Sequence, residues 1–451
     1  MTRILVRLRR RPAAVLIGLQ LAAITVVGGV TVARFHIFAG VDELAHISFV
    51  QQFAEHGSLP REGRSYVSWQ MEAIEQDTYP ARSTVNPRQI GLGGYSYEAW
   101  QPPLYYVVAA PAFLIPSNYR DKVFAVRAFD LLLLLVAAAI LALLARAVAA
   151  ERWQSAYAAA LSVLLWPGVI VRAITVSNAA LELPLALLYV LAVWHATRRP
   201  QASLLLAAAG LLGLCLLTGL TLVFLAPLLA VPIVALWRER GERARGATLR
   251  VAALAVTVPV ALLSPWLIAN EVRYGALTAG SVMRRISLSY VDPTGQNYGI
   301  GPALSSLWHL DHAMLPQEWW PQYGKIGLDV VALAVPALLL AGALAPALRR
   351  PALLRSSAAA LLLWPVVLGA IMLFVGELLE NWPVIFPRYI NAALPLLALF
   401  AAWAWGAGER RQATLLAATA AVSVLSAGVW VFMAGAYYFT NVGAALGIHA
   451  S

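Results

Sequence analysis

Two acids and a histidine open a short helical pattern that follows the first apolar stretch of the chain. Residues 40–57 read GVDELAHISFVQQFAEHG, in which Asp42 and Glu43 are adjacent and His46 follows within one helical turn. Side chains three and four residues apart lie on one face of a helix, so these three can face a single point. Carboxylates and an imidazole gathered in this way are suited to general acid–base catalysis, in which a side chain takes a proton from a reacting hydroxyl.

The same residues can be explained without chemistry. Apolar residues recur at spacings of three and four along this segment, at Leu44, Ile47, Val50, Phe53 and Ala54, and Gly57 and Pro60 end the pattern. In this interpretation Asp42 is only the N-cap of an amphipathic helix that rests on a membrane. The local pattern leaves both interpretations open.

A second acidic element precedes the next apolar segment. Residues 95–106 read YSYEAWQPPLYY and place Glu98 and Gln101 directly before Pro102-Pro103, with Tyr105 just after them. Proline is common at the first position of a helix and does not by itself indicate a function. The pairing of this element with the Asp42 element on one predicted loop, 34–102, makes both of them candidates for a shared site.

The elements that must position these residues are membrane helices. Hydrophobic residues make up 61% of the 451 positions and charged residues only 12%, and the mean hydropathy is +0.72. Such a composition exceeds what a soluble domain of this length needs, and only helices satisfy their own backbone groups inside lipid. We therefore predict an all-α polytopic membrane protein that forms a single membrane domain, 1–451, of about 11–12 transmembrane helices. Spans are expected near 13–33, 125–147, 155–171, 181–197, 202–217, 219–237, 250–269, 326–347, 356–377, 388–406 and 413–435, with 103–117 short or re-entrant.

Arginine clusters between the apolar runs predict the topology. They lie at 3–11, 146–152, 198–199, 238–245, 349–355 and 410–411, a spacing typical of cytoplasmic loops that face anionic lipid. The net charge of +11 is thereby explained without nucleic acid. With every cluster inside, both large polar loops, 34–102 and 270–325, lie outside the cytoplasm. The second loop is rich in Trp and Tyr, which suit either an interfacial belt or sugar stacking.

The two motifs of the first loop resemble those of the GT-C glycosyltransferases, particularly the bacterial branch that includes the lipid A aminoarabinose transferase and related oligosaccharide glycosyltransferases. In that branch an Asp-Glu pair after the first span is followed by an amphipathic helix and then by a Pro-Pro-Leu-x-Tyr element, as at 42–43 and 102–106 here. Looser matches follow at Asn178 in the second outer loop and at Arg388-Tyr389 near the last spans. The resemblance covers about residues 13–406.

This resemblance implies a GT-C-like bundle and an inverting transfer of a sugar from a polyprenyl-phosphate carrier. The acceptor would be a cell-envelope glycan, lipid or protein, and the site would face the periplasm or cell exterior from the bacterial cytoplasmic membrane. Asp42 would be the general base, with Glu43, His46 and Glu98 beside it to position the acceptor or a metal ion. The expected substrate-binding residues are Gln101, Tyr105, Asn178, Arg172, Lys325, Arg388 and Tyr389, with Arg388 on the lipid phosphate and Arg172 or Lys325 as alternative phosphate contacts.

Two departures from the family pattern keep the cofactor open. Gln101 replaces a basic residue often found before the Pro pair, and Asn178 replaces a common acid, so a divalent cation is neither required nor excluded. Two other classes also remain. A transporter or flippase for a lipid-linked sugar would use ionisable residues within the membrane, such as Glu182 and Glu377, and a non-catalytic scaffold would show no turnover at all.

Overall fold

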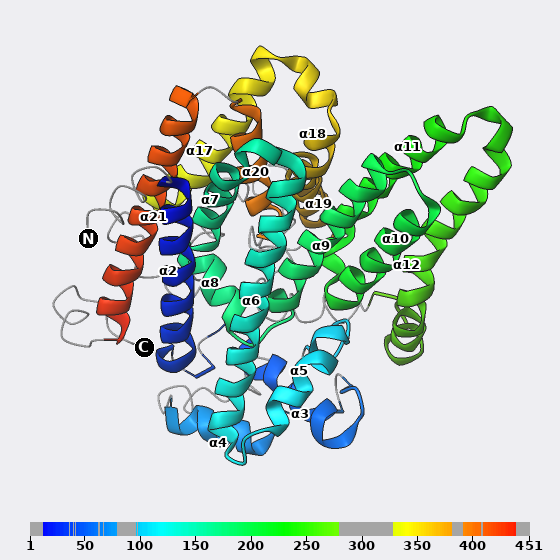
Figure 1. Cartoon of the computed structure of the whole chain (residues 1–451). Coiled ribbons are helices and arrows are strands. Elements are labelled where there is room, and N and C mark those ends of the chain that lie inside the picture. Colours follow the sequence, from blue (N-terminus) through cyan, green and yellow to red (C-terminus); the bar gives the residue numbers. More distant parts are fainter. Residues whose placement is uncertain are drawn as a thin grey trace.

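The fold is helical throughout the part of the chain that the structure describes. The computed structural model describes residues 12–35, 37–38, 40, 42–61, 64–65, 67–78, 96, 98–278, 328–380, 391–406 and 409–438. Every regular element in these ranges is a helix (Figure 1) and none is a strand. The predicted all-α class is therefore confirmed.

Six helical stretches among the described residues are long and apolar enough to cross a membrane. They comprise α2 (Pro12–Arg34), α6 with α7 (Tyr119–Ala149 and Trp153–Leu164), α9 (Ala179–Arg198), η4 with α11 (Leu220–Leu229 and Ala230–Arg240), α12 (Arg245–Tyr274) and α21 (Glu409–Tyr438). The chain is a multi-pass membrane protein.

Further apolar helices complete the bundle. They are α8 (Pro167–Ile174), α10 (Ala202–Thr218), α17 (Leu328–Arg349), α18 (Ser357–Leu362), α19 (Trp364–Glu380) and α20 (Leu394–Ala404). Several predicted boundaries need correction. The span expected at 155–171 is divided between α7 and α8, because Pro167 cannot continue the first helix and instead starts the second. The span expected at 219–237 begins as a 3-10 segment, so its first half is wound more tightly than an α-helix.

The candidate elements of the first loop lie together at one end of the bundle. Figure 1 shows α3 (Glu43–His56), α4 (Trp69–Thr78) and α5 (Leu104–Leu114) around the lower end of the long helix α6, while the α11–α12 turn and the α17–α18 connection lie at the opposite end. The eleven residues of α5 extend over about 16 Å at 1.5 Å per residue, well short of roughly 30 Å of hydrocarbon. The short segment predicted at 103–117 is thus confirmed.

Helix α3 packs against α5 rather than lying alone on a lipid surface. Ile47, Phe49 and Val50 of α3 share a buried apolar cluster with Tyr106 and Phe113 of α5. Gly57 ends α3 in the left-handed conformation, as its position in the sequence predicts, and its N–H donates to the Phe53 carbonyl oxygen. This small core fixes the N-terminus of α3 relative to the membrane helices.

Candidate functional site

Asp42 occupies the N-cap position of α3 in a left-handed backbone conformation. Its φ and ψ are 60° and 11°, and its side chain makes no capping hydrogen bond. The Glu43 N–H donates to the Gly40 carbonyl oxygen at 3.1 Å, which closes a tight turn around Asp42. Asp is one of the few non-glycine residues that tolerate this conformation. The side chain is therefore directed elsewhere than the helix N-terminus, and capping alone does not account for it.

Asp42, His46 and Glu98 come together in space. One potential ligand atom from each lies within 4.8 Å of the others. The imidazole and the Glu98 carboxylate are buried, at 5% and 8% exposure, whereas Asp42 is only partly buried. Two carboxylates and an imidazole can hold a divalent cation such as Zn²⁺ or Mn²⁺, and they can also share a proton with a bound hydroxyl.

The imidazole of His46 is held by a tyrosine to which the sequence motif assigned no role. Its Nδ1 lies 2.7 Å from the Tyr106 hydroxyl, and the Tyr106 ring stacks on Phe49 with centroids 3.7 Å apart. If the phenol donates to Nδ1, Nε2 carries the proton; if Nδ1 donates, Nε2 presents a lone pair that can bind a cation. The Tyr106 contact therefore determines which of the two roles His46 can fill.

A chain of amides extends the cluster to the membrane helices. Gln101 Nε2 donates to Glu98 Oε2 at 2.7 Å, and Asn178 Nδ2 donates both to Gln101 Oε1 at 3.4 Å and to the Thr218 carbonyl oxygen at 3.2 Å. Trp266 Nε1 donates to the Gln101 carbonyl oxygen at 3.2 Å. We call Asp42, His46 and Glu98 the acidic cluster. Gln101 and Asn178 lie beside this cluster and connect it to α9, α10 and α12.

A small cavity lies beside Ala179, the first residue of α9. Arg172, Glu182 and Asn391 line a space of about 20 Å³, which is room for one water molecule. The Glu182 carboxylate presses against the backbone of Gly219, where a Cβ would lie 2.0 Å from Oε1. The carboxylates of Asp42, Glu98 and Glu182 all lie close enough to the Tyr106 hydroxyl to interact with it electrostatically. Glu182 therefore extends the polar region toward Arg172.

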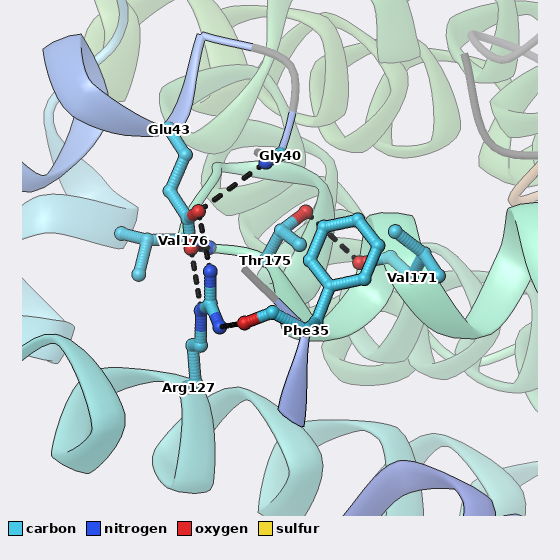
Figure 2. Close-up of polar contacts among 7 residues, drawn as sticks. All are labelled: Phe35, Gly40, Glu43, Arg127, Val171, Thr175 and Val176. Carbon is cyan, nitrogen blue, oxygen red and sulfur yellow. Dashed lines mark hydrogen bonds and ion pairs between the residues drawn. The ribbon is translucent and has the colours of Figure 1, made fainter. Parts of the chain in front are cut away.

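Glu43, adjacent to Asp42 in sequence, does not join the cluster. Its two carboxylate oxygens accept from Nε and Nη2 of Arg127 at 2.7 and 2.6 Å (Figure 2), and both side chains are fully buried. Arg127 Nη1 also donates to the Phe35 carbonyl oxygen at 2.7 Å. Backbone N–H groups of Gly40 and Val176 donate to the same carboxylate at 3.3 and 3.2 Å. The expectation that Glu43, Asp42 and His46 face one point is wrong for Glu43, because the buried guanidinium binds its carboxylate.

Tyr105 is directed away from the acidic cluster as well. Its hydroxyl lies 3.0 Å from each carboxylate oxygen of Asp130, which is fully buried on α6. Sequence reasoning missed both Arg127 and Asp130. The available signal was a pair of charged residues three apart within an apolar span, and ionisable residues in such a span mark functional or structural sites.

Three predicted binding residues, Lys325, Arg388 and Tyr389, lie outside the described residues. The nearest described position to the Arg-Tyr element is Asn391, which lines the cavity beside Arg172. Asn391 therefore places the start of the 391–406 segment beside Arg172 and Glu182.

Comparison with known proteins shows which known fold the chain resembles. No protein-family model matches the chain, and no curated protein does. Among solved structures, the chain is similar to ArnT from Cupriavidus metallidurans bound to undecaprenyl phosphate, with 16% identity and a TM-score of 0.52 over 93% of this chain and 69% of ArnT. The expected GT-C-type fold is therefore confirmed.

Proposed function

We propose that the chain transfers a sugar from a polyprenyl-phosphate carrier to an acceptor hydroxyl. The observation that carries the proposal is the meeting of Asp42, His46 and Glu98 at the end of a bundle with the fold of ArnT, a protein seen bound to undecaprenyl phosphate. A carboxylate that is only partly buried beside two buried polar groups can receive an acceptor from outside while its neighbours are fixed.

In this proposal Asp42 is the general base. The acceptor oxygen attacks the anomeric carbon, its proton passes to the Asp42 carboxylate, and the bond from the anomeric carbon to the phosphate oxygen breaks. The polyprenyl phosphate leaves with the bonding electron pair, and a single displacement inverts the anomeric centre. Gln101 and Asn178 would bind sugar or acceptor hydroxyls, because both amides lie beside Glu98.

A divalent cation fits the same three residues. When bound by Asp42, His46 and Glu98, it would supply positive charge beside the acceptor hydroxyl and make the loss of the hydroxyl proton easier. The ligand set suits this use because the second nitrogen of His46 is oriented by Tyr106, as second-sphere partners orient metal-binding imidazoles elsewhere. Tyr105 and Glu43 would take structural rather than substrate-binding or catalytic roles.

The lipid phosphate would be held on the other side of the amide chain. Arg388 with Tyr389 is proposed for this contact, with Arg172 or Lys325 as alternatives, because Arg172 lines a cavity together with Asn391, the first described residue after the Arg-Tyr element. A guanidinium can grip two phosphate oxygens, whereas an ammonium supplies only a point charge. We place this face on the periplasmic or exterior side of a bacterial cytoplasmic membrane, opposite the arginine clusters.

The test is turnover by the purified chain. The protein in detergent is given a panel of polyprenyl-phosphate sugars, and release of polyprenyl phosphate is measured in the presence of lipid and glycan acceptors. Acceptor-dependent release that disappears in Asp42→Asn supports the proposal. Release that continues at the wild-type rate in Asp42→Asn contradicts the role of Asp42.

A transporter of lipid-linked sugars is the second candidate, because Arg127, Glu43 and Asp130 are fully buried charged residues on or against a membrane helix. Proteoliposomes loaded with a fluorescent lipid-linked sugar separate the two functions. Movement between leaflets without loss of the sugar would favour transport, and sugar transfer without movement would favour the glycosyltransferase.

A further inference from the structure

The buried pair of Glu43 and Arg127 joins four segments that surround Asp42. Arg127 belongs to α6, Glu43 begins α3, Phe35 and Gly40 belong to the connection after α2, and Val176 lies between α8 and α9. Figure 2 shows these groups converging on one carboxylate and one guanidinium. Arg127 makes three of these hydrogen bonds, at 2.6–2.7 Å, and such lengths are typical of charge-assisted bonds.

The backbone at Asp42 needs support of this kind. A non-glycine residue at φ 60° is disfavoured and persists when surrounding structure determines it. The turn is closed twice, since the Glu43 N–H donates to the Gly40 carbonyl oxygen and the Gly40 N–H donates to the Glu43 carboxylate. Asp42 lies inside this closed turn, so the position of the Glu43 carboxylate determines where Asp42 can lie.

Gly40 brings the turn against the neighbouring segment. A Cβ added at Gly40 would lie 2.5 Å from the Cβ of Thr175, a separation that real atoms do not adopt. The adjacent Val176 N–H donates to Glu43. The turn is therefore held from two directions: by Arg127 from α6, and by the Thr175 side chain and the Val176 N–H from the connection between α8 and α9.

We infer that Arg127 is a positioning residue, which holds the Asp42 carboxylate in the acidic cluster through the Glu43 carboxylate and the turn at 40–43. The geometric part of this inference stands on the contacts alone, and its kinetic part rests on the proposed function. Arg127 lies in a membrane helix and its guanidinium binds the Glu43 carboxylate, so it acts on Asp42 through Glu43.

Two variants test the geometric part. Arg127→Lys keeps the charge but cannot form the two-point contact with Glu43 together with the bond to Phe35, and Gly40→Ala keeps every charge but displaces the turn from Thr175. The matched control is Arg120→Lys, which alters an exposed ion pair with Asp77 near the start of the same helix. Amide hydrogen exchange of the full chain in detergent is compared for residues 40–46 and for α7 at 153–164.

We expect exchange at 40–46 to become at least tenfold faster in Arg127→Lys and in Gly40→Ala, with 153–164 unchanged and the control like wild type. Wild-type exchange at 40–46 in both variants overturns the inference. An equal increase at 153–164 also overturns it, because general loosening of the bundle is then the cause. Gly40→Ala decides the matter if Arg127→Lys does not fold.

Transfer kinetics test the second part. Arg127→Lys should lower kcat at least tenfold while KM for the lipid-linked donor stays within about twofold, and it should have no further effect in an Asp42→Asn background. Additive losses in the double variant overturn the coupling to Asp42. If the wild-type chain transfers no sugar, the proposed function fails, and the exchange experiment still decides the positioning role.

Discussion

Asp42 and Glu43 are adjacent, carry the same charge and begin the same helix, yet they lie in opposite environments. Glu43 is fully buried and accepts four hydrogen bonds, two from Arg127 and two from backbone N–H groups. Asp42 is partly exposed, makes no capping bond and lies with His46 and Glu98. A fully buried carboxylate bound by a guanidinium stabilises the structure, whereas a partly exposed carboxylate beside an imidazole is accessible to an incoming group.

The largest effect is expected from Asp42→Asn, which tests whether Asp42 does chemistry that Glu43 does not. The amide tolerates the left-handed conformation as Asp does, so the fold should persist, but it cannot take a proton at neutral pH. Transfer should fall by roughly 10²–10⁴-fold, the usual contribution of a general base. Turnover and thermal unfolding of the purified variant are the measurements.

The matched control for Asp42→Asn is Asp77→Asn, which alters an exposed carboxylate on α4. It should change neither activity nor stability noticeably. A transfer rate in Asp42→Asn equal to that of the control would show that Asp42 is not the base.

Glu43→Gln should act on stability instead. It leaves the Arg127 guanidinium buried without its counter-charge, which costs about 3–5 kcal/mol when one partner of a buried pair is removed. Arg120→Ala, which breaks the exposed pair with Asp77, should cost no more than about 1 kcal/mol. Denaturation in detergent of both variants measures the difference. An equal loss of unfolding free energy in the two variants would mean that the buried ion pair contributes no more to stability than the exposed one.

Glu98→Gln tests whether the acidic cluster around Asp42 binds a cation. If the cluster holds a cation, removing one anionic ligand should weaken Zn²⁺ or Mn²⁺ binding by at least about tenfold, a lower bound taken from the loss of supporting groups at metal sites. Isothermal titration of the wild type, Glu98→Gln and the control Asp77→Asn, whose carboxylate is exposed on α4, gives the result. Cation affinity that is the same in Glu98→Gln as in the wild type would place any cation elsewhere.

The smallest effect is expected from Tyr106→Phe. The ring stack on Phe49 is kept, and only the hydrogen bond to His46 is lost, so the cost should be about 0.5–1.5 kcal/mol, or roughly a twofold to tenfold loss of transfer. Phe113→Leu serves as a control within the same apolar cluster. A loss far above tenfold in Tyr106→Phe would give the phenol a larger role than orienting the imidazole.

The sequence by itself determined the fold class, the short segment at α5 and the nearness of Asp42 to His46. Apolar runs and arginine clusters depend on local composition, and a spacing of four residues is converted into proximity by one turn of helix. Glycine at 57 and proline at 167 also act locally, which is why the end of α3 was predicted and the break between α7 and α8 can be understood from the sequence after the fact.

Only the tertiary structure decided which acid of the pair lies with His46 and Glu98. Arg127 is 84 residues from Glu43, and Asn178 is 77 residues from Gln101, so no local pattern links either pair. Tyr105 and Tyr106 are likewise adjacent in one motif, yet one meets Asp130 and the other His46. Partners so far apart in the sequence are determined by how the helices pack. The rotation of a helix about its own axis, which decides what each of its faces contacts, depends on the neighbouring helices.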